Sequence, residues 1–379
     1  MSDSLYKARI ERMKTRRKGS ASQLKVATES FSNSQYEGLE HYALLENILD
    51  KQEAWESRAK DDSATQYVIG AMQSVDSRYT QISVETADRI QNQLKKKLNN
   101  NLDFRVQGSV PLDIHIKGFS DVDLLIIDQQ MLMYSPEGVG SYAPTEKDSR
   151  DVIIALREDA RDALRSAFPA ADVNDDNNKS LRITGGSLQR EVDVVPGVWW
   201  DTLEYQETKD ENYRGVTIID KSTRERIYNS PFIHIKLIRD KCDQCDGGLR
   251  KSIRLLKTLK ADIKEEEKEI ALSSYDIASI MFHADVDNLR HNYFYELAVL
   301  VEIHRWLNYL CNNRDYAMQL DVPNKTRKIF ENDASFSALH DLTDIVNNVV
   351  NEVLSEVTGT PQAVYTDEKR TVLKNTMVL

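Results

Sequence analysis

Three aspartates in this sequence have the types and spacing of a metal-assisted catalytic site. Asp121 and Asp123 flank one valine and open the aliphatic run Leu124-Leu-Ile-Ile127, which is typical of a short buried strand. Side chains two residues apart on a strand point to the same face, so these two carboxylates are expected to lie side by side. Their charges repel each other unless a divalent cation lies between them. Magnesium prefers oxygen ligands and is commonly bound by one or two carboxylates together with substrate phosphates.

A third carboxylate, Asp193, follows Glu191-Val192 within a strand predicted over residues 189–195. Two metal ions about 3.5–4 Å apart stabilise both the attacking and the leaving oxygen of an in-line displacement. We expect Asp121 and Asp123 to bind both ions, and Asp193 to bind the ion that activates the attacking hydroxyl and to accept its proton. Two Mg²⁺ ions are therefore the expected cofactor, with Mn²⁺ as a substitute.

A glycine–serine turn supplies the phosphate end of this site. Residues 104–107 alternate like a short strand, and Gly108-Ser109 follows as a turn. Gly108 lets the backbone approach a triphosphate without a Cβ in the way, and Ser109 offers a hydroxyl and an amide donor. Neither motif is specific by itself, since Asp285-Val-Asp287 has the same spacing and is predicted to be a surface cap. The order of strand, Gly-Ser turn, acidic pair and late acidic strand favours a phosphate-transfer site.

The elements that must position these residues form an α/β region with helices on both sides of it. Residues 37–60 have a helical pattern, and residues 80–99 have an apolar stripe with three lysines near the end of the predicted helix. Gly185-Gly186 joins two predicted strands as a hairpin. The other predicted elements are strands over 121–127 and 180–184 and helices over 149–168, 249–268, 275–282, 293–312 and 339–357. We divide the chain into an N-terminal extension (1–65), a core (66–230) and a helical C-terminal domain (231–379).

Composition excludes several other classes of protein. The 379 residues include 61 acidic and 50 basic ones, for a net charge of -11, which counts against a protein that grips duplex nucleic acid. A basic stretch over residues 7–25 is interpreted as a solvated or disordered arm rather than a nucleic-acid contact. No apolar run approaches the roughly 18 residues of a membrane span, and no secretory signal opens the chain. With three cysteines, we expect a cytoplasmic protein without a disulfide framework.

Two further signals remain ambiguous between structure and function. Cys242 and Cys245 have the spacing of half a zinc site, and His234 precedes them, but no second cysteine pair completes four ligands. Two reduced thiols are the favoured interpretation, with zinc as the alternative. Trp199 and Trp200 either line a cleft beside Asp193 or belong to the core, which aromatic residues join more often.

These motifs together resemble a known family. The runs Gln107-Gly-Ser109, Ser120-Asp-Val-Asp-Leu-Leu125 and Arg190-Glu-Val-Asp-Val-Val-Pro196 are similar to the polymerase-β-type nucleotidyltransferases. Within them the chain most resembles the bacterial CD-NTases, which are DncV-like relatives of animal cyclic GMP-AMP synthase and oligoadenylate synthase. The resemblance extends from about Ile82 to Phe282. It implies a polymerase-β-like core with a mixed sheet, followed by a helical C-terminal domain that closes the nucleotide cleft.

The resemblance also implies nucleotide contacts outside the acidic site. Arg254-Leu-Leu-Lys257 matches the helix whose lysine binds the donor triphosphate, and the alternative for Lys257 is a solvated helix charge. Ser274 would contact phosphate and Tyr275 would stack on the donor base, in agreement with the chemistry of these side chains. For Tyr275 the alternative is packing at a helix start. The run Leu112-Asp-Ile114 departs from the family, in which a threonine often stands.

The sequence therefore predicts a magnesium-dependent nucleotidyltransferase that makes a cyclic or linear oligonucleotide signal from ATP, GTP or other nucleoside triphosphates. By resemblance, the product acts on a downstream effector during phage infection, and contact with a membrane or with nucleic acid is not expected. One alternative is a transferase that modifies RNA or protein. Another is a catalytically idle module that binds nucleotide.

Overall fold

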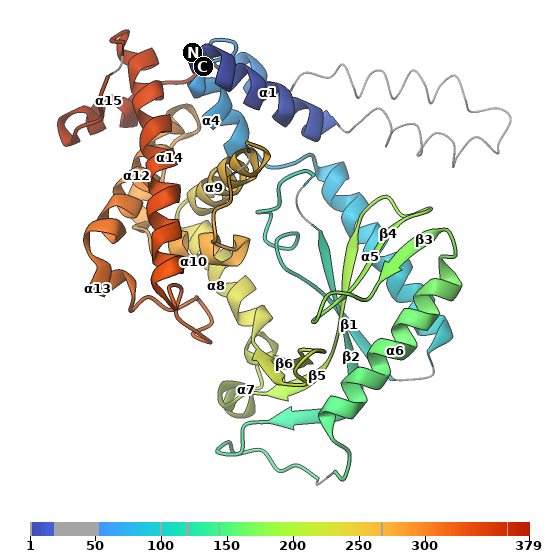
Figure 1. The fold of residues 1–379 in the computed structure, drawn as a ribbon. Helices are drawn as coiled ribbons and strands as arrows, with labels where there is room; N and C mark the ends of the chain where they lie inside the picture. Colours follow the sequence, from blue (N-terminus) through green and yellow to red (C-terminus); the bar gives the residue numbers. More distant parts are fainter. Residues whose placement is uncertain are drawn as a thin grey trace, which may run out of the picture. The chain divides into compact units, whose positions relative to one another are not determined.

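The computed structural model describes residues 2–18, 53–98, 101–118, 121–143, 145–266, 268–361 and 363–379. The chain forms two compact units, which we call the sheet unit and the helical unit (Figure 1). The sheet unit contains residues 76–113 and 120–237, and the helical unit contains residues 1–75, 114–119 and 238–379. The division between them falls within helix α8 (Pro231–Gln244).

The sheet unit is built on a mixed seven-stranded sheet. Strands β2 and β5 are parallel neighbours, β1 is antiparallel to β2, and β4 and β6 are both antiparallel to β5, β4 near its start and β6 near its end. Strand β3 pairs with β4, and β7 pairs with β6. The strands are β1 (Leu102–Gln107), β2 (Val122–Tyr134), β3 (Ala171–Asn174), β4 (Leu181–Gly185), β5 (Val192–Asp201), β6 (Gly215–Ile219) and β7 (Arg226–Asn229).

Two helices cover one face of this sheet, α5 (Ser77–Lys97) and α6 (Ser149–Ala167). Their apolar stripes pack on alternate side chains of β2 and β5 in one buried cluster, in which Ile90, Leu156, Leu124 and Val194 take part. The intervening side chains of the same strands face the other way, and some of them form a second cluster with Trp199 and β6. The two faces of β2 therefore have separate environments. The sheet unit also contains α7 (Leu203–Thr208) and η2 (Glu211–Tyr213).

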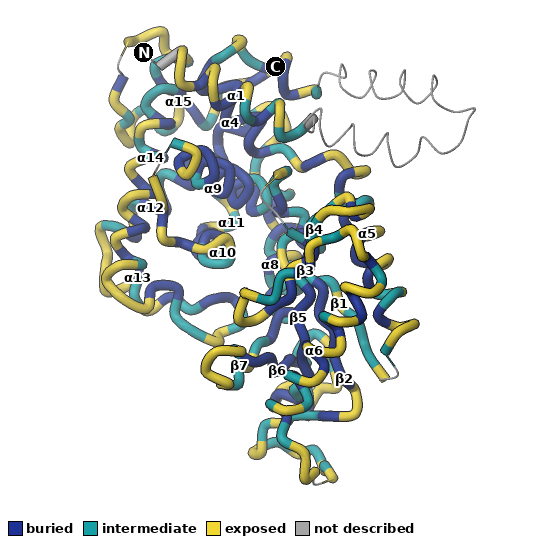
Figure 2. The backbone as a smooth tube through the Cα atoms, turned by 45° about the vertical axis from the view of Figure 1, so that its right-hand side comes forward, coloured by how far each residue is buried: buried dark blue, intermediate teal, exposed yellow. Residues whose placement is uncertain are grey.

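In the helical unit, α9 (Gly248–Glu265) packs against α4, α10 and α12. Most of its residues are buried, as Figure 2 shows. Helices α12 and α14 pack against each other, and α14 also contacts α4. The other elements of this unit are α1 (Ser2–Lys18), η1 (Ala54–Ser57), α4 (Ala64–Met72), α10 (Ser274–Phe282), α11 (Val286–Leu289), η3 (Tyr293–Tyr295), α12 (Leu297–Asn312), α13 (Arg314–Ala317), α14 (Asp333–Thr358), η4 (Asp367–Lys369) and α15 (Arg370–Lys374).

The basic N-terminal stretch was wrongly interpreted as a solvated arm. Its described part belongs to α1, which buries Tyr6, Ile10 and Met13. Arg9 donates to Glu266 over 2.8 Å and Arg16 donates to Asp262 over 2.9 Å, both within the helical unit. The arginines of α1 therefore compensate acidic side chains near the end of α9. Residues 19–25 of the basic stretch lie outside the described residues.

The predicted α/β region followed by helices is confirmed. The helix predicted over 80–99 is α5, the hairpin at Gly185-Gly186 joins β4 to β5, and the strand predicted over 121–127 extends to Tyr134 as β2. Most of the helix predicted over 37–60 lies outside the described residues, and its last part contains only the 3₁₀ turn η1. The part of the chain that the structure describes has no helix long and apolar enough to cross a membrane.

Candidate active site

The parallel pairing of β2 with β5 brings the acidic residues of both strands together. Asp123 lies directly opposite Asp193 in the register, and Val122 lies opposite Val192. Asp121 immediately precedes β2, on the same side of the strand as Asp123. Acidic residues 70 positions apart in the sequence are thus neighbours at the starting ends of two adjacent strands.

Alternation along the strands explains why these carboxylates are accessible. Val122 and Val192 are fully buried beneath α5 and α6, so Asp123 and Asp193 point to the other face of the sheet. The side chain of Asp121 is 40% exposed and that of Asp193 is 14% exposed. The same alternation that buries the valines on one face places the acids on the other face of the sheet.

Gly108 lies against the acidic pair. β1 ends at Gln107, which is the register partner of Asp123, and Gly108 then turns with a φ of +77°. A Cβ on Gly108 would lie 2.1 Å from Oδ2 of Asp123. This distance is too short for a non-bonded contact, so any other residue here would displace the carboxylate. The glycine therefore leaves both the left-handed turn and the Asp123 carboxylate undisturbed. Ser109 follows in the same turn and is half-buried.

Arg182 is a member of this cluster that sequence reasoning missed. It lies on β4 directly opposite Asp193, and its guanidinium pairs with Glu191 (2.7 Å), Asp193 (3.3 Å) and Asp121 (3.4 Å). Burial raises the pKa of Asp121 to about 6, with the charges of Glu191 and Asp193 adding to the rise and that of Arg182 opposing it. The predicted hairpin was the available signal, because it places β4 beside the strand that carries Asp193.

The type of ligand offered here fits magnesium. Three carboxylates on adjacent strands supply the oxygen donors that this ion prefers, and the burial and like charges around Asp121 favour a cation beside it. As described, however, the side chains of Asp121 and Asp193 are turned toward Arg182. Among the described residues no three His, Cys, Asp or Glu side chains are already arranged to hold a metal ion.

The three predicted nucleotide contacts lie in the helical unit. Lys257 on α9 is 5% exposed and donates from Nζ to the carbonyl of Ile114 over 2.9 Å. Ser274 is exposed and begins α10, directly after the N-cap Ser273. Tyr275 is half-buried, and its hydroxyl donates to Oδ1 of Asn324 over 3.0 Å.

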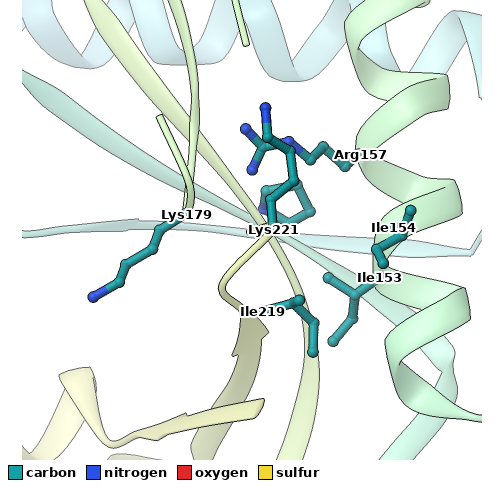
Figure 3. Close-up of a pocket in the computed structure, with 7 residues that line it drawn as sticks. Ile153, Ile154, Arg157, Lys179, Ile219 and Lys221 are labelled. Atoms are coloured by element: carbon teal, nitrogen blue, oxygen red, sulfur yellow. The ribbon is translucent and has the colours of Figure 1, made fainter. Parts of the chain in front are cut away.

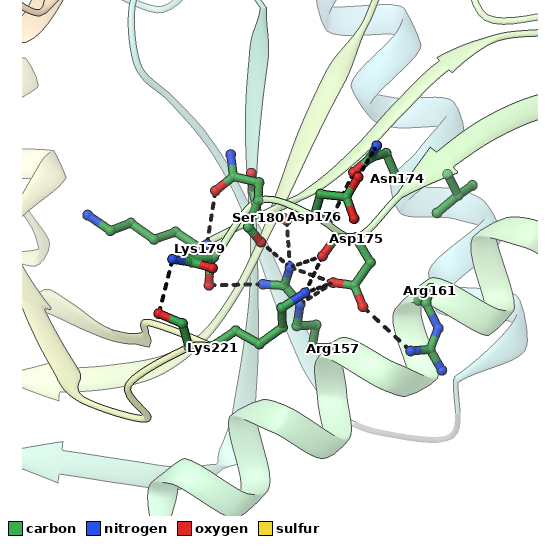
Figure 4. A network of polar contacts seen from close by, with 12 residues as sticks. Arg157, Arg161, Asn174, Asp175, Asp176, Lys179, Ser180 and Lys221 are labelled. Carbon is green, nitrogen blue, oxygen red and sulfur yellow. Dashed lines mark hydrogen bonds and ion pairs between the residues drawn. The ribbon is translucent and has the colours of Figure 1, made fainter.

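Arg157 fixes the loop before β4, the strand that carries Arg182. The guanidinium of this buried α6 residue donates to Asp175 over 2.7 Å and to the carbonyl of Ser180 over 2.8 Å (Figure 4). Lys221 pairs with the same Asp175 at 3.3 Å. A hollow of only about 10 Å³ lies beside this network (Figure 3), which is far too small for a nucleotide. Its lining residues are Ile153, Ile154, Arg157, Lys179, Pro196, Ile219 and Lys221.

Packing accounts for Trp199, and Cys242 and Cys245 also lie in a buried environment. Trp199 is 4% exposed and belongs to the cluster on the second face of the sheet. Cys242 and Cys245 are buried free thiols, and burial raises the pKa of Cys242 to about 12, which keeps that thiol protonated at neutral pH. Asp285 accepts from the backbone amide of Asn288 over 2.8 Å and caps α11, as predicted.

Comparison with known sequences gives consistent matches over this whole arrangement. A sequence profile of the C-terminal helical domain of cGAS/DncV-like nucleotidyltransferases matches residues 236–354. The chain is 69% identical over 378 residues to the cyclic dinucleotide synthase CdnE of Yersinia aleksiciae, covering the full length of both chains. It is 28% identical over 265 residues to a c-di-GMP synthase of a Lachnospiraceae bacterium (strain RUG226), covering 64% of this chain and 75% of the relative.

Solved structures share the fold. The STING-associated CdnE c-di-GMP synthase of Capnocytophaga granulosa superposes with a TM-score of 0.68 at 24% identity, over 93% of this chain and 99% of that one. The CdnE cyclic dinucleotide synthase of Elizabethkingia meningoseptica superposes with a TM-score of 0.58 at 18% identity, over 75% of this chain and 98% of that one. The predicted fold, a polymerase-β-like core followed by a helical region, is confirmed.

Proposed function

Because this chain belongs to the CD-NTase family of cGAS/DncV-like nucleotidyltransferases, we propose that it joins nucleoside triphosphates, ATP or GTP among them, into a cyclic dinucleotide. The single observation that carries the site assignment is the register pairing of Asp123 with Asp193, which unites acids that lie far apart in the sequence. The full-length similarity to the Yersinia aleksiciae cyclic dinucleotide synthase supports the choice of product.

Each residue of the cluster has a role in this chemistry. Asp121, Asp123 and Asp193 would hold two Mg²⁺ ions, or Mn²⁺, which when bound stabilise charge on the attacking and leaving oxygens. Asp193 accepts the proton of the attacking ribose hydroxyl at its carboxylate. The hydroxyl oxygen forms a bond to the α-phosphorus as the bond to the β-phosphate oxygen breaks and pyrophosphate leaves. Gly108 and Ser109 receive the triphosphate through open backbone and a hydroxyl donor.

The family resemblance also assigns nucleotide contacts to three residues of the helical unit. The Lys257 ammonium neutralises phosphate charge, Ser274 donates its hydroxyl to a phosphate oxygen, and the Tyr275 ring stacks on the donor base. The exposed position of Ser274 at the start of α10 suits a phosphate contact. We further propose that the product acts on a downstream effector during phage infection, as the family resemblance implies.

Replacing the Tyr275 ring should weaken substrate binding more than it slows the chemical step. Base stacking contributes roughly 1–3 kcal/mol, so Tyr275→Ala is expected to raise KM for the triphosphate by about tenfold or more. Tyr275→Phe keeps the ring and removes the hydroxyl that donates to Asn324, so it serves as the control and should retain nearly the wild-type KM. Equal KM values for all three proteins would remove Tyr275 from the site.

Product analysis tests the proposed function. Purified protein with Mg²⁺ and all four ribonucleoside triphosphates should release pyrophosphate and form a phosphatase-resistant product that mass spectrometry identifies as a cyclic dinucleotide. Label that appears instead on RNA or protein in a cell extract would indicate a modifying transferase. Tight nucleotide binding without any incorporation would indicate a module that has lost catalysis.

A further inference from the structure

One arginine faces two of the three carboxylates that the proposed function assigns to cation binding. Arg182 Nε lies 2.7 Å from Oε1 of Glu191 and 3.3 Å from Oδ1 of Asp193, and Nη2 lies 3.4 Å from Oδ2 of Asp121. The backbone dictates this arrangement, because Arg182 is the direct cross-strand partner of Asp193 in the β4–β5 ladder. Cross-strand partners share a face of the sheet and their side chains meet.

The guanidinium and a divalent cation would compete for the same oxygens. Asp193 and Asp121 each direct an oxygen at Arg182 in the described arrangement. A cation near those oxygens is attracted by the carboxylates and repelled by the arginine charge, so binding of either positive group weakens binding of the other. In the described arrangement the guanidinium therefore holds oxygens of Asp121 and Asp193 that a bound cation would need.

Arg182 also has a second partner, Glu191, with which it can stay paired when it leaves the aspartates. Its shortest contact is with Glu191, whose side chain is 31% exposed and which precedes β5. The Arg182 side chain itself is 44% exposed, so it can move outward without breaking buried packing. Glu191 can therefore keep the arginine paired after the two aspartates turn to a cation.

We propose that Arg182 is a built-in counter-ion of the active site, which neutralises Asp121 and Asp193 when no divalent cation is bound and moves onto Glu191 when the cations bind. This inference rests on the proposed function, since it needs those aspartates to be cation ligands. Arg182 is thus a positioning residue that lowers cation affinity while it stabilises the metal-free protein.

Titration of nucleotide-free protein with Mn²⁺, with free Mn²⁺ followed by electron paramagnetic resonance, tests this competition. Exposed ion pairs are individually weak, but a cation must displace two of them, those of Arg182 with Asp121 and Asp193. Arg182→Gln removes both, so this variant should bind Mn²⁺ about fivefold more tightly or better than wild type. Arg182→Lys keeps the charge and should remain close to wild type. Arg224→Gln is the matched control, because it removes one exposed arginine charge that pairs with Asp151 over 2.6 Å.

Thermal unfolding of the metal-free protein tests separately whether Arg182 neutralises the aspartates. In EDTA, Arg182→Gln leaves the acids uncompensated, so its thermal unfolding midpoint should fall below that of Arg224→Gln by about 2 °C or more, and Mn²⁺ should restore it. Unchanged or weaker Mn²⁺ binding by Arg182→Gln, or an unfolding midpoint equal to that of Arg224→Gln, would overturn the proposal. If Asp123→Asn leaves Mn²⁺ binding intact, the proposed function fails instead, so the two failures are distinguishable.

Discussion

Changing both Asp121 and Asp123 to asparagine should abolish turnover, with a loss of at least about 10³-fold. Asparagine has nearly the shape of aspartate, but a neutral amide is a poor ligand for magnesium and leaves the triphosphate charge uncompensated. Pyrophosphate release measures the loss. We expect the variant to fold, because both side chains are at least partly accessible and Val122 between them keeps its buried position.

The chain offers a control with the same spacing. Asp285 and Asp287 repeat the motif, and Asp285 caps α11, a role that asparagine fills as well as aspartate. Asp285→Asn with Asp287→Asn should therefore keep wild-type turnover and the same unfolding midpoint. Substantial turnover in the Asp121/Asp123 variant would show that these carboxylates do not bind the catalytic cations.

Gly108→Ala should lower turnover by about 10²-fold while the protein stays folded, because the added methyl group needs the space of the Asp123 carboxylate. The Cβ would lie 2.1 Å from Oδ2 of Asp123, so that carboxylate must move by an ångström or more, and misplacement of this size costs roughly 10²-fold in rate. Initial rates of pyrophosphate release at saturating triphosphate measure the effect.

Gly185→Ala separates this contact from backbone strain. Gly185 has nearly the same φ (+78° against +77°), but a Cβ there meets no atom within 4 Å. Both substitutions carry the cost of placing alanine in the left-handed region, and only Gly108→Ala disturbs Asp123. Gly185→Ala should change turnover by less than about twofold. Equal losses in the two variants would mean that Gly108 serves the backbone and not the carboxylate.

Local sequence signals were sufficient for the elements that carry the site. The apolar stripe of residues 80–99 has helical spacing and corresponds to α5. The short aliphatic run after Asp123 is typical of a buried strand and corresponds to β2. Asp193 could be identified as a candidate site residue because its strand begins with alternating acidic and aliphatic residues. The sequence predicts that this acid lies near Asp123, and in the register of β2 and β5 the two residues are direct neighbours.

The features that escaped sequence reasoning depend on strand register, on long-range pairing or on elements too short to show a pattern. The β4–β5 register places Arg182 opposite Asp193. A strand pattern alone does not fix that register. The arginines of α1 pair with acids about 250 positions away, so their local sequence shows a charged stretch and nothing of its partner. The short strands β3, β6 and β7 contain four or five residues each and have little periodicity to detect.

The central claim is that Asp121, Asp123 and Asp193 hold the catalytic cations together. Anomalous diffraction at the manganese edge, from crystals grown with Mn²⁺ and a non-hydrolysable ATP analogue, tests it most directly. We predict anomalous peaks within about 2–2.5 Å of carboxylate oxygens of all three aspartates, with Arg182 paired to Glu191 alone. Manganese bound at other residues, with Asp121 and Asp193 still facing Arg182, would contradict the account.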